Sequence, residues 1–236
     1  ILVWSINAAG LNTIGAQHDL ISRAERHNIH LILVQETCFT DTASYILADW
    51  KIIATAKAEN TKIGVACFIS PKLLPSLANF ITISHRLMAI TFLTVVGLCT
   101  FINQYFPPQD SPPNLKDEHK ENLHYLLAPL PKSSIVILMG DTNTRWHGRK
   151  PDEHDILGPH IFGCGIDYLD NHPHHHRDYA VDLLRSHSLI NISSKFQKAP
   201  KYKATYITPG TRLHAPRTPD KYAELDLVYG NTAALT

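Results

Sequence analysis

Polar side chains follow several apolar runs of this sequence, at the point where each run ends. The run 135–139 stops at a glycine and is followed by Asp141 and Asn143, two positions apart. Strand ends in a stacked-sheet core can converge on one rim, so acids, amides and a phenol at successive ends predict one polar pocket. Taken alone, each is more often a hydrogen-bonded core or cap residue. The candidates are Asn7, Glu36, Tyr105, Asp141, Asn143 and Asp226.

The elements that must position these groups are short β-rich runs separated by amphipathic helices. The chain begins with a β-α-β pattern, and the proline-rich segment 107–114 interrupts the later strands because proline suits neither a helix interior nor a central strand. The expected strands cover 1–7, 29–37, 50–56, 63–70, 87–106, 134–141, 203–209 and 224–230. The expected helices cover 17–28, 115–130 and 177–190.

Length, composition and charge set the limits of the fold and of its partners. With 236 residues and 44% hydrophobic content, the chain can form one large domain, although two small domains also fit the length. The formal net charge of +1 neither requires nor excludes a nucleic-acid partner. Basic residues concentrate between Lys195 and Lys221, where Asp220 is the only acid. This stretch is either the region that would hold a polyanion or a solvated basic loop.

The cysteines and the apolar runs indicate the compartment. Cys38, Cys67, Cys99 and Cys164 are far apart and show no CxxC spacing, which favours reduced thiols in an intracellular protein. No apolar run approaches the ~18 residues of a membrane span, so we expect a soluble protein without a membrane partner. The chain starts at Ile1 inside an apolar strand, which suggests a piece of a longer polypeptide.

Six motifs, taken in chain order, carry a family resemblance. "SINAAGL", "LVQET", "NQYFPP", "MGDTN", "KATYITP" and "ELDLVY" are similar to successive motifs of the endonuclease/exonuclease/phosphatase superfamily. The resemblance implies an α/β fold, a four-layer sandwich of two packed, mostly antiparallel sheets flanked by helices. It also implies that 1–236 form a single domain that cuts phosphoester bonds with a divalent metal.

Within that superfamily, "GDTNTRWHG" and "HSLINISSKF" resemble the endonuclease domain of non-LTR (LINE-type) retrotransposons. The resemblance implies a domain that nicks double-stranded DNA to prime reverse transcription of the element. Its other implied partner is the rest of a reverse-transcriptase polyprotein. A nuclear location and a monomeric isolated domain are expected with it.

The same resemblance implies roles for the candidate residues. Glu36 would bind Mg²⁺, with Mn²⁺ as a substitute, and Asn7 beside it would orient a water molecule or the phosphate. Asp141, next to the metal, would position or deprotonate the attacking water. Asn143 would donate a hydrogen bond to a phosphate oxygen, and Tyr105 would also hydrogen-bond the phosphate.

The resemblance also implies DNA contacts. Thr205 matches a threonine that contacts DNA in the retrotransposon enzymes. Arg86 aligns with a family arginine but equally suits a surface charge. Lys201 and Lys203, in the basic stretch, are further candidates for backbone contacts.

Two departures from the family pattern change the expectation. Ala9 occupies the position of a second acid in apurinic endonucleases, which argues against abasic-site repair. In the family, Asp226 orients a histidine of a downstream Ser-Asp-His motif, but only ten residues follow Asp226 here. We therefore expect a domain truncated at its C-terminus, lacking its last strand, with one sheet edge unpaired and poor nuclease activity.

Two alternative functions and one motif remain open. The alternatives are a phosphatase of the same fold acting on a small phosphorylated ligand, and a catalytically dead domain that binds DNA or a partner. The motif is the histidine cluster His172, His174, His175 and His176 around Pro173. It fits an incidental exposed loop better than a Zn²⁺ or Ni²⁺ site, because Pro173 lies inside the cluster and no cysteine is nearby. Contact with the DNA backbone is a further alternative.

Overall fold

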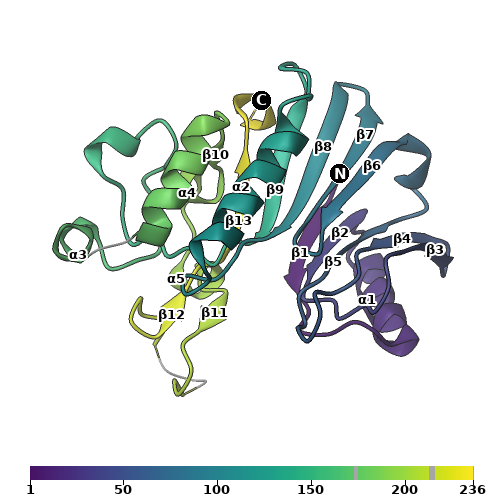
Figure 1. Ribbon diagram of the computed structural model, residues 1–236, viewed down its shortest axis with the longest axis horizontal. Helices are drawn as coiled ribbons and strands as arrows, with labels where there is room; N and C mark the ends of the chain where they lie inside the picture. The colour runs from purple at the N-terminus through teal and green to yellow at the C-terminus, as the bar shows by residue number, and fades with distance from the viewer. Residues whose placement is uncertain (173–174, 213–215, 236) are drawn as a thin grey trace.

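Two β-sheets face each other and carry helices on their outer faces, so the chain forms four layers (Figure 1). The computed structural model describes residues 1–172, 175–212 and 216–235. The predicted α/β sandwich of two packed, mostly antiparallel sheets is confirmed, because only two of the pairings within these sheets are parallel, β1 with β2 and β8 with β9.

The first sheet has five strands in the order β1-β2-β5-β4-β3. These are β1 (Val3–Asn7), β2 (Leu31–Gln35), β5 (Val65–Ile69), β4 (Trp50–Ala54) and β3 (Ala43–Leu47). Every residue of β2 and β5 is buried, as expected for continuous apolar runs covered on both faces. Helix α1 (Ile14–Arg26) packs on the outer face, and its N-cap is Thr13, whose Oγ1 accepts a hydrogen bond from the Ala16 amide at 3.3 Å.

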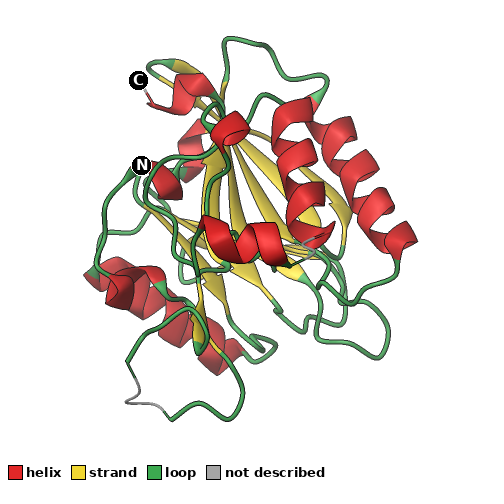
Figure 2. Ribbon diagram, turned by 90° about the vertical axis from the view of Figure 1, so that its left-hand side faces the viewer, coloured by secondary structure: helices red, strands yellow, loops and turns green. Residues whose placement is uncertain are grey.

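The second sheet has six strands in the order β10-β13-β9-β8-β7-β6. These are β10 (Ile190–Asn191), β13 (Asp226–Gly230), β9 (Ile135–Asp141), β8 (Gly97–Tyr105), β7 (Leu87–Thr94) and β6 (Leu77–Ser84). Helices α2 (Pro113–Leu127) and α4 (His175–Ser186) lie against its outer face (Figure 2). Each presents leucines at helical spacing to the sheet, which explains why the sequence pattern located both helices.

Smaller elements complete the chain between and after the sheets. A two-stranded sheet pairs β11 (Tyr206–Ile207) with β12 (Tyr222–Ala223). The short helices are α3 (Ile166–Asn171), α5 (Pro200–Lys203), η1 (Leu74–Ser76), η2 (Pro151–Glu153), η3 (Ser193–Lys195) and η4 (Thr232–Leu235). None of the described helices is long and apolar enough to cross a membrane.

A buried polar bridge joins the two sheets inside the apolar core. The Asn103 side-chain amide of β8 donates to the carbonyl oxygens of Val34 and Ala66 in the first sheet, at 3.0 and 2.8 Å. Its Oδ1 accepts a hydrogen bond from Gln35 Nε2 at 2.6 Å. Asn103 and Gln35 are both fully buried, so these bonds fix how one sheet lies on the other.

The structure differs from the sequence expectation in several elements. The run 87–106 is a hairpin rather than one continuous strand, because the chain turns at Val95 and Val96 between β7 and β8. Strands β3 and β6 were not predicted; both are sheet-edge strands, whose exposed side chains weaken the apolar pattern. Helix α4 begins at His175, two residues before the predicted start.

Two further expectations concern an unpaired sheet edge and reduced cysteine thiols. Within the described residues, β1 pairs only with β2 and thus leaves one edge of the first sheet open. The four cysteines are free: Cys67 and Cys99 are buried, Cys38 is half-buried and Cys164 is exposed.

Candidate active site

Five of the six candidate residues lie at or just beyond strand ends that meet on one rim. Asn7 ends β1, Glu36 directly follows β2, and Asp141 ends β9. In the second sheet, Asp141 pairs with Tyr105 on one side and with Asp226 on the other. The register therefore places Tyr105, Asp141 and Asp226 in one row across three neighbouring strands.

The Asn7 side chain joins the two sheets at this rim. Its Nδ2 donates to Glu36 Oε1 at 2.9 Å and to Asp141 Oδ2 at 3.3 Å. Asn7 and Glu36 belong to the first sheet, whereas Asp141 belongs to the second. One carboxamide thus holds together two carboxylates that are more than a hundred residues apart in the sequence.

Asn143 is fixed by its own hydrogen bonds next to Asp141. Its backbone amide donates to Asp141 Oδ1 at 2.9 Å, and its side-chain Nδ2 donates to the Phe106 carbonyl at 2.7 Å. The backbone of Asn143 has φ +47° and that of Glu36 has φ +53°, both in the left-handed region that non-glycine residues rarely adopt. Such strain concentrates at functional sites, where neighbouring bonds hold it in place.

The position before Asp141 requires a glycine, Gly140. Its backbone has φ +133°, and a Cβ atom at this position would lie 2.0 Å from the Gln104 carbonyl oxygen of the paired strand β8. Any other residue would push β9 away from β8. Glycine therefore allows the two strands to deliver Tyr105 and Asp141 side by side.

The site carries more negative charge than its surroundings neutralise. Burial, and then the nearby charges of Asp226 and Glu36, raise the pKa of Asp141 to about 6, although bonds from Asn143 and Asn7 partly oppose this rise. Burial, and then the charges of Glu36 and Asp141, raise the pKa of Tyr105 to about 12. Tyr105 is therefore a neutral hydrogen-bond donor at physiological pH.

The Thr205 side chain binds the backbone next to and at Asp226. The Thr205 Oγ1 accepts hydrogen bonds from the backbone amides of Leu225 at 2.9 Å and of Asp226 at 3.1 Å. Burial raises the pKa of Asp226, and its Oδ1 is buried without a hydrogen-bond partner among the described residues.

The expected DNA-contacting residues occupy different environments. Arg86 is only 9% exposed and its guanidinium lies 5.3 Å from the centre of the Tyr105 ring, so it is not the surface charge that was its alternative. Lys201 is exposed and lies over the Tyr202 ring at 4.7 Å. Lys203 is buried and its ammonium donates to the His160 carbonyl. A DNA contact by Lys203 would require this ammonium to leave that carbonyl.

Arg145, two residues after Asn143, was not among the predicted site residues. Its guanidinium donates to Thr208 Oγ1 at 3.3 Å and lies 6.0 Å from the centre of the Tyr206 ring. Arg145 thus connects the segment after β9 with the β11–β12 hairpin. The available signal was its place in "GDTNTRW", inside the motif that carried the resemblance.

A buried ion pair secures the same segment. Arg177 of α4 and Glu153 are 2% and 3% exposed, and Arg177 Nη1 donates to Glu153 Oε1 at 2.7 Å. Arg177 also donates to the carbonyls of Trp146 and Gly148, each at 2.9 Å. No sequence pattern marked either residue, because the pair closes over 24 positions.

The histidine cluster separates into members with different environments. His174 and Pro173 lie outside the described residues. His172 and His175 are exposed, as expected of an incidental loop, and His172 Nδ1 lies 2.9 Å from the Tyr168 carbonyl oxygen. His176 is only 5% exposed, so an exposed loop is wrong for this residue. Because α4 begins at His175, His176 turns inward within the first helical turn.

No compact metal centre of the zinc type is present among the residues that the structure describes. No group of three or more His, Cys, Asp or Glu side chains could hold a metal ion there. Oxygen atoms at the rim come instead from the paired carboxylates of Glu36 and Asp141 and from Asp226. Mg²⁺ is commonly held by one or two carboxylates together with water and substrate phosphate, so this arrangement suits it better than a cation that needs a full protein cage.

The fold and this rim define a class of phosphoester hydrolases, and the chain belongs to the endonuclease/exonuclease/phosphatase family, whose model matches residues 3–236. Members of the family are hydrolases that act on phosphodiester bonds, and they generally use divalent metal ions. A comparison with curated protein sequences finds no significant match.

Solved structures that are similar to the chain include a retrotransposon endonuclease domain and an AP endonuclease. The endonuclease domain of TRAS1, a telomere-specific non-LTR retrotransposon, is 17% identical, with 99% of this chain and 86% of that chain covered and a TM-score of 0.60. The catalytic domain of APE2 from Xenopus laevis is 16% identical, with 98% and 82% covered and a TM-score of 0.65. An AP endonuclease from Archaeoglobus fulgidus is 17% identical, with 98% and 87% covered and a TM-score of 0.59. At these identities the likeness supports the shared fold.

Proposed function

We propose that this chain is a metal-dependent endonuclease domain that nicks double-stranded DNA, within a retrotransposon polyprotein, to prime reverse transcription. The observation that carries the proposal is the Asn7 amide, which holds Glu36 of one sheet against Asp141 of the other. The structural likeness to the TRAS1 endonuclease domain supports the retrotransposon setting. A nuclear protein that acts as a monomeric domain fits this setting.

The rim residues fit Mg²⁺, with Mn²⁺ as a substitute. Glu36, Asp141 and Asn7 would hold the ion, since carboxylate and carboxamide oxygens are ligands that hard cations prefer. The raised pKa of Asp141 and the unpartnered Oδ1 of Asp226 indicate that the rim lacks a compensating positive charge. When bound, the ion would neutralise charge on the scissile phosphate.

The side chains around this position have protonation states suited to hydrolysis. Asp141, with a pKa of about 6, is mostly ionised at neutral pH and is basic enough to accept a proton from the attacking water. Tyr105 remains protonated because its pKa is about 12, so its hydroxyl can donate to a phosphate oxygen. The Asn143 amide uses one N–H on the Phe106 carbonyl and also interacts with the Tyr105 hydroxyl, so it would donate its second N–H to the phosphate by turning away from Tyr105.

DNA would extend from this rim across the residues that the sequence assigned to it. Thr205 holds Asp226 through its backbone amide and is itself exposed, so its neighbourhood is open to a DNA strand. Arg86 lies beside Tyr105, and Lys201 adds an exposed charge. Lys203 would join only after release from His160. We propose these contacts as sequence-independent backbone contacts.

A low rate is part of the proposal. The hydrogen bonds of Asp141, Asn143 and Asp226 within the described residues involve no histidine. One missing general acid-base group typically costs a factor of about 10² to 10⁴ in rate. We therefore propose that this arrangement of Asp141, Asn143 and Asp226, without a bonded histidine, nicks DNA slowly.

Conversion of supercoiled plasmid to open circles, with Mg²⁺, Mn²⁺ or EDTA, tests the function. We expect slow nicking that requires the metal and is lost in Glu36→Gln. Asp170→Asn, which removes an exposed acid on α3, is the matched control and should nick like the parent chain. Turnover of a small phosphomonoester instead of plasmid would favour a phosphatase. Tight DNA binding without product under any condition would favour a dead binding domain.

A further inference from the structure

Phe106 lies directly behind the candidate active site and touches it through its backbone. It follows the last residue of β8. Its amide donates to the Asp141 carbonyl at 2.9 Å, and its own carbonyl accepts the Asn143 side-chain amide at 2.7 Å. The position of the Phe106 backbone therefore sets where the Asn143 carboxamide lies.

Three aromatic side chains from two helices surround the Phe106 ring. His119 of α2 meets it edge to face, with ring centres 5.0 Å apart and an interplanar angle of 88°. His176 of α4 lies at 5.1 Å and 62°, and Tyr179 of α4 lies at 5.7 Å and 47°. We name His119, His176 and Tyr179 the Phe106 cage. Such contacts contribute beyond the buried area because ring edges carry positive and ring faces negative charge.

The cage is itself anchored and uncharged. His119 Nε2 lies 3.4 Å from Gln104 Oε1 of β8, and the Tyr179 hydroxyl donates to the Lys116 carbonyl of α2. Burial lowers the pKa of His119 to about 3 and that of His176 to about 4. Both imidazoles are therefore neutral near pH 7 and pack like small aromatic rings.

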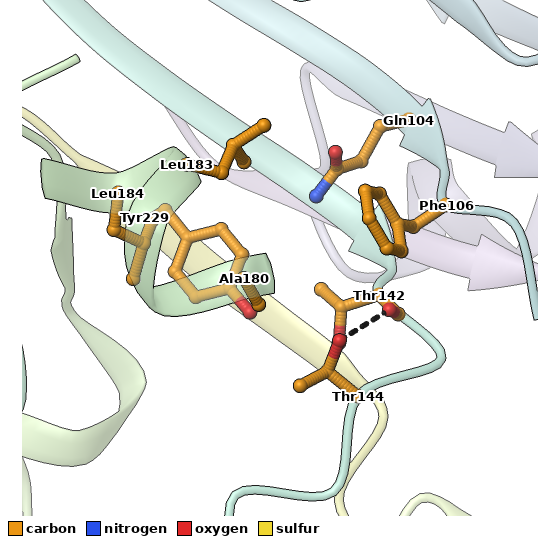
Figure 3. A pocket seen from close by; sticks show the side chains of 8 residues that line it. All are labelled: Gln104, Phe106, Thr142, Thr144, Ala180, Leu183, Leu184 and Tyr229. Atoms are coloured by element: carbon orange, nitrogen blue, oxygen red, sulfur yellow. Dashed lines mark hydrogen bonds between the residues drawn. The ribbon is translucent and has the colours of Figure 1, made fainter. Parts of the chain in front are cut away.

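The Phe106 ring is not packed solidly on every side. A small hollow beside it is lined by Gln104 of β8, by Thr142, which directly follows β9, and by Ala180 and Leu183 of α4 (Figure 3). Phe106 lines this hollow as well, so loss of a cage member would enlarge the free space next to its ring. The contacts of the cage therefore keep the Phe106 ring in place.

We propose that His176 is a positioning residue, which holds the Asn143 carboxamide in its working place through the ring and carbonyl of Phe106. The inference rests on the proposed function of this site in phosphoester hydrolysis. It gives one histidine of the cluster a specific role in the interior. The neighbouring His175 is exposed and serves as a matched control on the same helix.

The side-chain amide signal of Asn143 in ¹H–¹⁵N spectra provides a test that needs no activity. Its absence in Asn143→Asp assigns it. We expect His176→Ala to shift this signal and to speed its exchange with water by about tenfold, as loss of one hydrogen bond would. His176→Phe, which keeps an aromatic ring, and His175→Ala should preserve both properties. Phe106→Leu should reproduce the effect of His176→Ala and replaces it if that variant does not fold.

The nicking assay separates this inference from the function on which it rests. If the parent chain nicks plasmid, His176→Ala should lower kcat by about 10- to 100-fold with little change in KM, because a misplaced group weakens the chemical step more than binding. If the parent chain does not nick, the proposed function fails. The side-chain amide signal of Asn143 still tests whether His176 positions Asn143. An Asn143 signal unchanged in both His176→Ala and Phe106→Leu would overturn the inference, as would an equal effect of His175→Ala.

Discussion

Replacing Asp141 by asparagine should stabilise the folded chain at neutral pH and abolish its nuclease activity. The Asp141 carboxylate is only 8% exposed and lies between the charges of Asp226 and Glu36. Folding therefore works against its ionisation. Asparagine has nearly the same shape and carries no charge, so the variant removes the repulsion without leaving a cavity.

The size of the effect follows from the pKa of the carboxyl group. Folding raises this pKa from 3.8 to about 6, and each pKa unit corresponds to about 1.4 kcal/mol. The shift therefore sets an upper bound of about 3 kcal/mol on the stabilisation at pH 7.5. Asn7 Nδ2 would lose its hydrogen bond to Asp141 if the new amide turned its nitrogen toward Asn7, which costs about 1 kcal/mol. We expect a net gain of about 1 to 2 kcal/mol.

The contribution of Asp141 to folding stability should decrease as the pH rises. Because the folded pKa lies above the unfolded value, the unfolded chain loses its proton first as the pH rises. The contribution of Asp141 to stability is thus fully present below about pH 3.8, falls between about 3.8 and 6, and is constant above that range. The parent chain should lose this contribution on the way to neutral pH, whereas Asp141→Asn should not.

Urea unfolding of both proteins at pH 4 and pH 7.5 in EDTA measures the difference. Comparison of parent and variant at each pH cancels the titration of all other groups that they share. Mg²⁺ should stabilise the parent chain at pH 7.5 and have little effect on Asp141→Asn. An Asp141→Asn protein that is less stable than the parent at pH 7.5, or a difference that does not change with pH, would refute the reasoning.

Three further predictions concern the surroundings of the site. Gly140→Ala should destabilise the fold by about 3 kcal/mol or more in urea unfolding, because the new Cβ meets a backbone oxygen at 2.0 Å and φ is +133°; wild-type stability would contradict the close approach of the strands. Arg177→Met should cost about 3 to 5 kcal/mol, and adding Glu153→Leu should restore part of the loss, because a lone buried charge is worse than none; no restoration in the double variant would argue against the pair. Tyr105→Phe should slow plasmid nicking about 100-fold at unchanged stability, since it removes one donor to the phosphate; full activity would remove Tyr105 from the proposed chemistry.

The rim itself was predictable because it depends on where strands end. The run before Asp141 is apolar on both faces of the sheet, and the polarity changes abruptly at Gly140, so the end of β9 was visible in the sequence. The same change follows β2 at Glu36. Parallel pairing of β1 with β2 and of β8 with β9 then brings these ends together.

The surroundings of the rim were not predictable because they depend on contacts distant in sequence. Burial of His176 follows from the start of α4 two residues earlier than its apolar pattern showed, which turns one imidazole inward and leaves its neighbour outside. The ammonium of Lys203 looked like a surface charge, yet a carbonyl more than forty positions away receives it. Charge type and local periodicity carry no information on such partners.

The polar bridge of Asn103 has a consequence for engineering this fold. The proposed catalytic groups belong to two sheets, and the chain crosses from the first sheet to the second in the short segment 70–76, which contains η1. Sliding of one sheet over the other by a fraction of a residue would pull Glu36 from Asp141 while leaving every strand intact. The hydrogen bonds of Asn103 and Gln35 join the two sheets and oppose such sliding. A chimera that takes its two sheets from different relatives should therefore inherit these amides as a matched set.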